Sequence, residues 1–234
     1  MNRRLYALHR FIGAIAFLQL AVWTVTGGFF TLFDIDEVRG RTTHVDQVAL
    51  PAQLGVITPA TALAVASSEG MTLVDSLELK ATPRGLFYFA RRNTEVVRLD
   101  ARTGRIVEVD AQEAIAVARG DQPGNPEMIS VAPASRQDVA YRGKPLPAWR
   151  VRLADAKGTD VYVDASTGAV TARRGNLWRT YDFLWSLHIM DYGERENFHH
   201  PLITGAAALA FATVVSGVVL WFLRLRRWLR ARRV

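Results

Sequence analysis

The chain contains no cysteine. This absence excludes disulfide bonds, iron–sulfur clusters, thiolate zinc sites and cysteine nucleophiles, whatever the redox state of the compartment. The sequence also lacks HExxH, GxGxxG, a Walker loop and the Ser/His/Asp order of a serine hydrolase. It therefore carries none of the common fingerprints of hydrolases, kinases or dinucleotide-binding enzymes.

Acidic residues are absent from both ends of the chain. Before Asp34 the only charged side chains are three arginines, and after Glu196 they are six arginines. The middle holds the other 20 of 29 basic residues and all 22 acidic ones, so the net charge of +7 belongs to the ends. Both ends flank apolar spans, which is the positive-inside pattern of a membrane protein, and we expect no nucleic-acid partner.

Charge is also missing from two long apolar stretches, Phe11–Phe33 and Pro201–Leu223, of 23 residues each. A helix of that length spans about 35 Å, enough to cross a lipid bilayer. A cleaved signal peptide is the alternative for the first stretch. Signal peptides, however, have a shorter apolar region followed by a small-x-small cleavage pattern, whereas in this chain the apolar region is longer and no such pattern follows it before Asp34. We expect two membrane helices, with both termini in the cytoplasm and the central domain in the periplasm of a bacterial inner membrane.

Small and hydroxylated residues share one face of each predicted membrane helix. In the first helix the face consists of His9, Gly13, Ala16, Leu20, Thr24, Gly27 and Thr31, and in the second of His200, Thr204, Ala208, Ala212 and Ser216. In lipid, such a face lets another helix or a flat ligand approach closely. Helix–helix packing alone is the simpler interpretation.

Between the two spans the chain repeats itself. The motif Asp-x-x-Thr-Gly begins at Asp100 and again at Asp164, 64 residues later, each time between β-branched runs. This pattern predicts two hairpin turns, in which the Asp side chain bonds local backbone N–H groups and Gly supplies a positive φ. Duplicated turn chemistry explains Asp100 and Asp164 without a catalytic role.

Each repeat forms part of a predicted helix-plus-strand module. Thr58 caps a helix over Pro59–Ser68, and Asp110 caps one over Ala111–Arg119. Strand-like alternation follows at Gly85–Phe89 and Trp149–Leu153. The segment Asp121–Pro147 is rich in Pro and Gly, which predicts an irregular insertion in the second module.

Four features in this order resemble the PepSY-associated transmembrane family. They are Leu8–Gly13 opening the first helix, the two Asp-x-x-Thr-Gly hairpins, Leu187–His188, and Ser216–Trp221 near the end of the last helix. The resemblance covers nearly the whole chain. Larger relatives have about four membrane helices and include inner-membrane reductases of ferric siderophores that resemble b-type cytochromes. The resemblance therefore implies haem b and electron transfer, with a second copy or another membrane protein completing the helical bundle.

The expected fold is an α+β membrane protein in which two transmembrane helices flank a periplasmic tandem of PepSY-like helix-plus-antiparallel-sheet modules. The predicted segments are 1–35 (first membrane helix), 36–57 (connector), 58–110 and 111–175 (the two modules), 176–199 (interfacial amphipathic segment), 200–223 (second membrane helix) and 224–234 (basic cytoplasmic tail). The aromatic residues Trp178, Tyr181, Trp185 and Tyr192 indicate that the interfacial segment lies at the bilayer surface.

Histidines are the candidate ligands of the haem iron that the resemblance implies. His9 lies at the cytoplasmic end of its helix, whereas His188, His199 and His200 lie at the outer end, about 30 Å away across the hydrocarbon layer. One haem cannot bridge the two groups. An outer haem could use His188 with His200 or His199, and an inner haem at His9 requires a histidine from a second chain. Ordinary polar residues at a membrane surface are the simpler alternative.

Four further polar residues are not expected to bind the haem iron directly. His44 in the connector is expected to be solvated. Asp191, Glu194 and Glu196 could tune a metal site near His188 through hydrogen bonds, although a solvated rim is the simpler interpretation.

Three functions fit this pattern. The first is a haem b-binding electron-transfer protein that acts on ferric iron or ferric chelates as a dimer. The second is a non-enzymatic periplasmic protein that binds a peptide, a protease or a membrane partner. The third is an accessory subunit, in which a different protein supplies the rest of the helical bundle.

Overall fold

The computed structural model describes residues 3–42, 50 and 55–232. The chain divides into a helical unit, Met1–Asp34 with Thr180–Val234, and a central unit, Ile35–Arg179. The positions of His44 and of most of the predicted connector fall outside the described residues. What the structure describes of that connector includes a short helix, α2 (Ile35–Val38).

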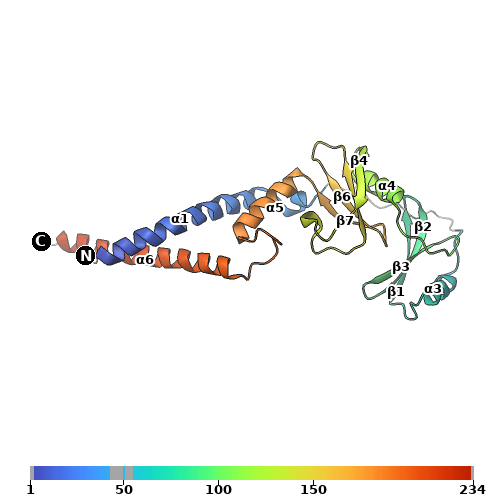
Figure 1. Ribbon diagram of the computed structural model, residues 1–234, viewed down its shortest axis with the longest axis horizontal. Coiled ribbons are helices and arrows are strands. Elements are labelled where there is room, and N and C mark those ends of the chain that lie inside the picture. The colour runs from blue at the N-terminus through green and yellow to red at the C-terminus, as the bar shows by residue number, and fades with distance from the viewer. Residues whose placement is uncertain (1–2, 43–49, 51–54, 233–234) are drawn as a thin grey trace. The chain divides into compact units, whose positions relative to one another are not determined.

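The helical unit is built on two long helices, α1 (Arg3–Leu32) and α6 (Pro201–Ala231), which lie side by side and antiparallel. The start of α1 and the end of α6 lie at the same end of the pair (Figure 1). Both helices are long and apolar enough to cross a membrane. Large apolar side chains such as Phe17 and Phe211 are more than 70% exposed, as contact with lipid tails requires. The two predicted spans are confirmed as helices.

Both helices are longer than their uncharged cores. α6 continues to Ala231, so most of the predicted separate tail, 224–234, belongs to the helix. The physical reason is that no Gly or Pro follows Gly217, while Arg and Leu are strong helix formers.

Helix α5 (Asn176–Ile189) joins the two units. It is shorter than the predicted interfacial segment and ends where Met190 adopts a positive φ of 57°. Its later residues pack on α1, with the ring of Tyr181 4.6 Å from that of Phe30. The aromatic residues predicted to form a belt therefore also build a contact between α5 and α1.

The first module of the central unit consists of α3 (Pro59–Ser68) and the antiparallel strands β1 (Ser76–Thr82), β2 (Gly85–Arg92) and β3 (Glu95–Asp100). Thr58 caps α3 as predicted, because its hydroxyl accepts a hydrogen bond from the backbone N–H of Thr61. The core contains Ala62 and Ala66 of α3 and Tyr88 and Leu99 of the sheet.

The second module consists of α4 (Ala111–Asp121) and the antiparallel strands β4 (Met128–Pro133), β5 (Ala148–Leu153), β6 (Asp160–Asp164) and β7 (Val170–Arg174) in that order. Ala114 and Ala118 of α4 pack with Val151 and Val161 on one face of the sheet. The prediction of an irregular insertion over Asp121–Pro147 was wrong in part. Strand β4 lies inside it, because the apolar run Met128–Val131 pairs with β5.

The duplicated turns have the predicted chemistry. The carboxylate of Asp100 accepts backbone N–H groups of residues 102 and 103, and that of Asp164 accepts those of residues 166 and 167. Gly104 and Gly168 have φ values of 72° and 74°. The second turn joins β6 to β7 as a hairpin, whereas after the first turn the chain returns through a single bridge, Leu99 to Ile106.

Candidate functional site

Two histidine–hydroxyl pairs connect the helices of the helical unit. In the first pair, Nδ1 of His9 on α1 lies 2.7 Å from Oγ of Ser216 on α6. The Ser216 hydroxyl donates its single hydrogen to the carbonyl of Thr213, 3.0 Å away. With its hydrogen directed to the Thr213 carbonyl, the hydroxyl accepts from Nδ1 of His9, and in that tautomer the lone pair of the neutral ring is on Nε2.

The second pair joins α5 to α1. Nδ1 of His188 lies 2.7 Å from Oγ1 of Thr26, which is only 2% exposed. The Thr26 hydroxyl donates its hydrogen to the carbonyl of Val22 at 2.8 Å, so it accepts from His188 in turn. The tautomer of His188 that donates from Nδ1 in this arrangement has Nε2 as its unprotonated nitrogen. Its backbone is also held, because Nε1 of Trp23 donates to the His188 carbonyl at 2.7 Å.

Aromatic rings surround His188. The ring centroids of Phe30, Trp23 and Trp185 lie 5.4, 6.3 and 6.5 Å from that of His188. Burial lowers the pKa of His188, because the charged imidazolium loses hydration there. The neutral form, which is the form that binds metals, is therefore favoured at pH 7.

Glycines lie against both rings. A Cβ added to Gly217 would be 3.4 Å from Cε1 of His9, and one added to Gly27 would be 3.9 Å from Cε1 of His188. Larger residues at these positions would press on the imidazoles. The absence of side chains here lets the helix backbone approach each ring closely.

The two pairs are far apart along the membrane span. His9 and Thr26 are 17 residues apart on α1, which corresponds to about 25 Å along the helix. The two contacts therefore lie at different depths along α1. These are two separate sites, each with one histidine of this chain.

The other two predicted histidines are less suited to bind a metal in this conformation. Nε2 of His200 lies 3.0 Å from the carbonyl of Ile189, so that nitrogen is the donor of a hydrogen bond. His199 is exposed, and its ring packs beside that of Phe198 at 5.6 Å. Across the described residues, no group of three or more His, Cys, Asp or Glu side chains could hold a metal ion.

The loop after α5 is held by its own polar groups. The carboxylate of Asp191 accepts N–H groups from Gly193, Glu196 and Asn197, and these bonds lower the pKa of Asp191. Asp191 therefore acts within its loop. Nη1 of Arg195 pairs with the buried carboxylate of Asp182 at 2.5 Å, which ties this loop back to α5.

A groove of about 410 Å³ lies between α1 and α6. Its lining is mainly apolar and includes Trp23, Gly205 and Ala206, together with the amide side chain of Gln19. Nε2 of Gln19 is buried and has no hydrogen-bond partner within the described part of the chain. The groove can accept an apolar body, and a hydrogen-bond acceptor within reach of Gln19 would satisfy that amide.

Sequence reasoning found Ser216 on a predicted small-residue face but missed Thr26. It placed Thr24 on the small-residue face of α1, and Thr24 is exposed and bonds the carbonyl of Leu20. Thr26 lies about 100° around α1 from His9. The helix therefore uses one face for α6 and another for α5, and a single periodic pattern could not reveal both.

Comparison with known families gives one match, to the PepSY-associated TM region, over residues 8–234. The chain belongs to the PepSY-associated TM region family. No curated protein and no solved structure matches it. This PepSY-family chain is thus a membrane protein with two candidate spans flanking a central α+β region.

The residues of this PepSY-family chain fit one side of a haem. A haem-binding histidine commonly donates its other ring N–H to a polar partner, which fixes the ring and raises its basicity. His9 and His188 both have this arrangement, with Ser216 and Thr26 as the partners. Each contact involves one histidine of this chain, and that histidine is the residue that would hold the group.

Proposed function

We propose that this protein is an inner-membrane electron-transfer protein that binds haem b as a homodimer and delivers electrons to ferric iron or a ferric chelate. The observation that carries the proposal is the pair of His9–Ser216 and His188–Thr26 contacts, one near each end of the span. Haem iron, when bound, changes reversibly between ferric and ferrous states and so carries single electrons. Two such sites would give a route across the membrane.

A second copy of the chain completes both sites. A two-fold axis parallel to the helices brings equivalent histidines together, His9 with His9 and His188 with His188, within a four-helix bundle. The apolar groove between α1 and α6 could take a side chain of the second copy, and an acceptor on that copy could bond the amide of Gln19, which has no partner among the described residues. A different membrane protein in place of the second copy is the accessory-subunit version of the same proposal.

The orientation follows from the arginines. Three lie before Asp34 and six after Glu196, and the helix ends that carry them lie together. Positive charge is retained in the cytoplasm, so the central unit is proposed to lie in the periplasm of a bacterial cell.

The test is an absorption spectrum of the full chain, expressed with added haem precursor and purified in mild detergent. The proposal predicts a Soret band, α and β bands on reduction, and a low-spin signal typical of two histidine ligands. Light scattering should give the mass of a dimer. A preparation without a Soret band, despite haem supply, contradicts the haem proposal, and a haem-loaded monomer contradicts the dimer.

A second candidate function is peptide or partner binding by the central unit. Strand β4 is at the edge of its sheet, and Ile129 on it is 61% exposed. An extended peptide could add to such an edge by backbone hydrogen bonds. Crosslinking in cells from a photoreactive residue at position 129 tests this function, which predicts a crosslinked partner; recovery of the uncrosslinked chain alone contradicts it.

A further inference from the structure

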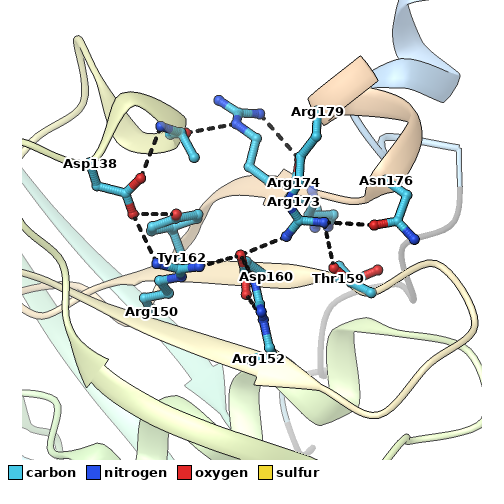
Figure 2. A network of polar contacts seen from close by, with 12 residues as sticks. Asp138, Arg150, Arg152, Thr159, Asp160, Tyr162, Arg173, Arg174, Asn176 and Arg179 are labelled. Carbon is cyan, nitrogen blue, oxygen red and sulfur yellow. Dashed lines mark hydrogen bonds and ion pairs between the residues drawn. The ribbon is translucent and has the colours of Figure 1, made fainter. Parts of the chain in front are cut away.

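The sheet of the second module has one apolar face and one face rich in arginine. Helix α4 covers the apolar face, where Val151 and Val161 are buried. Because side chains alternate along a strand, Arg150 and Arg152 of β5 and Asp160 of β6 lie on the opposite face. Figure 2 shows the guanidinium groups of this face gathered around Asp160.

Asp160 is the centre of this arrangement. Its side chain is 1% exposed, and its two oxygens accept hydrogen bonds of 2.7–2.8 Å from Arg150, Arg152 and Arg179. Burial acts to raise the pKa of Asp160, but the bonds from Arg152 and Arg150 outweigh it and leave the pKa below its ordinary value. Three cations thus share one ionised carboxylate.

A second carboxylate on this face, that of Asp138, also accepts hydrogen bonds from within the protein. Asp138 accepts the hydroxyl hydrogen of Tyr162 at 2.6 Å and the backbone N–H of Ala140 at 3.0 Å. Its distance to Nη1 of Arg150 is 3.5 Å, a longer ion pair. Asp138 and Asp160 therefore each already have several donors.

We call Arg150, Arg152, Arg174 and Arg179 the arginine face. The guanidinium of Arg174 lies 4.4 Å from the centre of the Trp178 ring, and its Nε donates to the carbonyl of Ala140. Around the buried carboxylate of Asp160 lie three guanidinium groups, those of Arg150, Arg152 and Arg179.

The guanidinium groups around Asp160 are accessible to solvent. The side chains of Arg150, Arg152 and Arg179 are each 35–39% exposed, although Asp160 beneath them is buried. Each guanidinium has five N–H groups, and the contacts among the described residues use only Nε and Nη2 of Arg152. Further N–H groups therefore remain for an acceptor from outside, and an anion would relieve the repulsion between the cations.

We infer that the arginine face is a binding site for a small oxyanion that presents carboxylate or phosphate groups. Guanidinium groups match both kinds of oxyanion, because their parallel N–H groups reach two oxygens at once. The site is separate from the histidine sites, and the inference does not depend on haem.

The experiment is isothermal titration calorimetry of the full chain in detergent, with citrate in one arm and inorganic phosphate in the other. Saturable binding at low ionic strength is expected for at least one anion, with affinity that falls as salt is added. Arg150→Gln and Arg152→Gln should each weaken it by about tenfold, as loss of a charged hydrogen-bond donor does. The anion that binds more tightly identifies the chemistry of the ligand.

The single variants should keep the fold, and a matched variant outside the arginine face serves as the control. Each single variant leaves Asp160 with two arginine partners, so the central unit should keep its circular dichroism spectrum. The matched control is Arg105→Gln, which removes an exposed arginine of the first module and should leave the affinity unchanged. Absence of saturable binding in both arms, or equal weakening by Arg105→Gln, would overturn the inference.

Discussion

Nδ1 of His188 lies 2.7 Å from the hydroxyl oxygen of Thr26, a residue 162 positions earlier in the chain. With the hydroxyl hydrogen directed to the Val22 carbonyl, the oxygen of Thr26 accepts from Nδ1 of His188. The same arrangement recurs at His9 and Ser216. Two histidines are thus oriented by hydroxyl groups before any ligand binds.

Thr26→Val removes the acceptor of the His188 N–H while keeping the shape of the side chain. We expect haem affinity at the His188 site to fall by about 10–100-fold, as loss of such a partner typically does. Thr26→Ser should restore it. Haem titration followed by absorbance measures the effect, and Thr31→Val, which removes an exposed hydroxyl on the same helix, is the control. Equal losses in both valine variants would argue against a positioning role.

Gly217→Leu places a side chain where the ring of His9 now lies, because an added Cβ is already 3.4 Å from it. We expect this variant to lose the haem at His9 and retain the haem at His188, so the haem content per chain should fall by about half. Gly28→Leu is the control, since nothing lies within 4 Å of a Cβ added at that position. A full haem complement in Gly217→Leu would contradict the assignment of His9.

A buried ion pair joins the two modules of the central unit. Arg98 of β3 makes two hydrogen bonds to Glu113 of α4, and the two side chains are 1% and 0% exposed. Glu113→Gln should destabilise the unit by about 3–5 kcal/mol, because Arg98 is left buried without its counter-ion. Arg98→Met with Glu113→Leu should recover most of the loss. Urea unfolding followed by near-ultraviolet circular dichroism measures both.

The control for this pair is Glu78→Gln, which breaks the exposed ion pair with Lys80 and should leave the unfolding midpoint unchanged. A double variant as unstable as the single variant would mean that the polar pair itself, and not the uncompensated charge, is needed for packing.

Asp160 should make stability depend on pH in the acid range. Its pKa is lowered from 3.8 in the folded protein, so its contribution is present above that pH and is lost as the pH falls and the carboxylate is protonated. Asp160→Asn should lower the free energy of unfolding at pH 7 and flatten its decrease below about pH 4. Glu95→Gln, at an exposed position, should retain the wild-type slope. An unchanged slope in Asp160→Asn would contradict this linkage.

The absence of cysteine makes the topology easy to test. A single thiol introduced by Ser67→Cys, at an exposed position of α3, should react with a membrane-impermeant maleimide added to spheroplasts. A thiol introduced by Ala231→Cys should react only after lysis. The opposite result would place the central unit in the cytoplasm and contradict the proposed direction of electron transfer.

Local sequence signals predicted the parts of the fold that depend on near neighbours. The spans follow from uninterrupted apolar residues, the caps from Thr58 and Asp110, and the turns from the Asp-x-x-Thr-Gly motif. Strand β1 alternates apolar Leu77, Leu79 and Ala81 with polar residues, and these three side chains pack against the core of the first module. Strand β4 was hidden by the surrounding Pro and Gly residues.

The polar contacts could not be predicted because they depend on tertiary packing. Thr26 is buried only because α5 packs on a second face of α1. Asp160 collects arginines from β5 and α5, and Arg98 meets Glu113 across two modules. Sequence periodicity indicated which residues share a face, but not which face meets which neighbour.

The most direct measurement of the central claim is the ratio of haem to polypeptide in the purified dimer. Wild-type protein should contain about one haem per chain, because a dimer has one site made by two His9 residues and one made by two His188 residues. His9→Ala and His188→Ala should each reduce the ratio to about half, and the double variant to zero. Haem bound at the wild-type ratio in the double variant, or no haem in the wild type, would contradict the account.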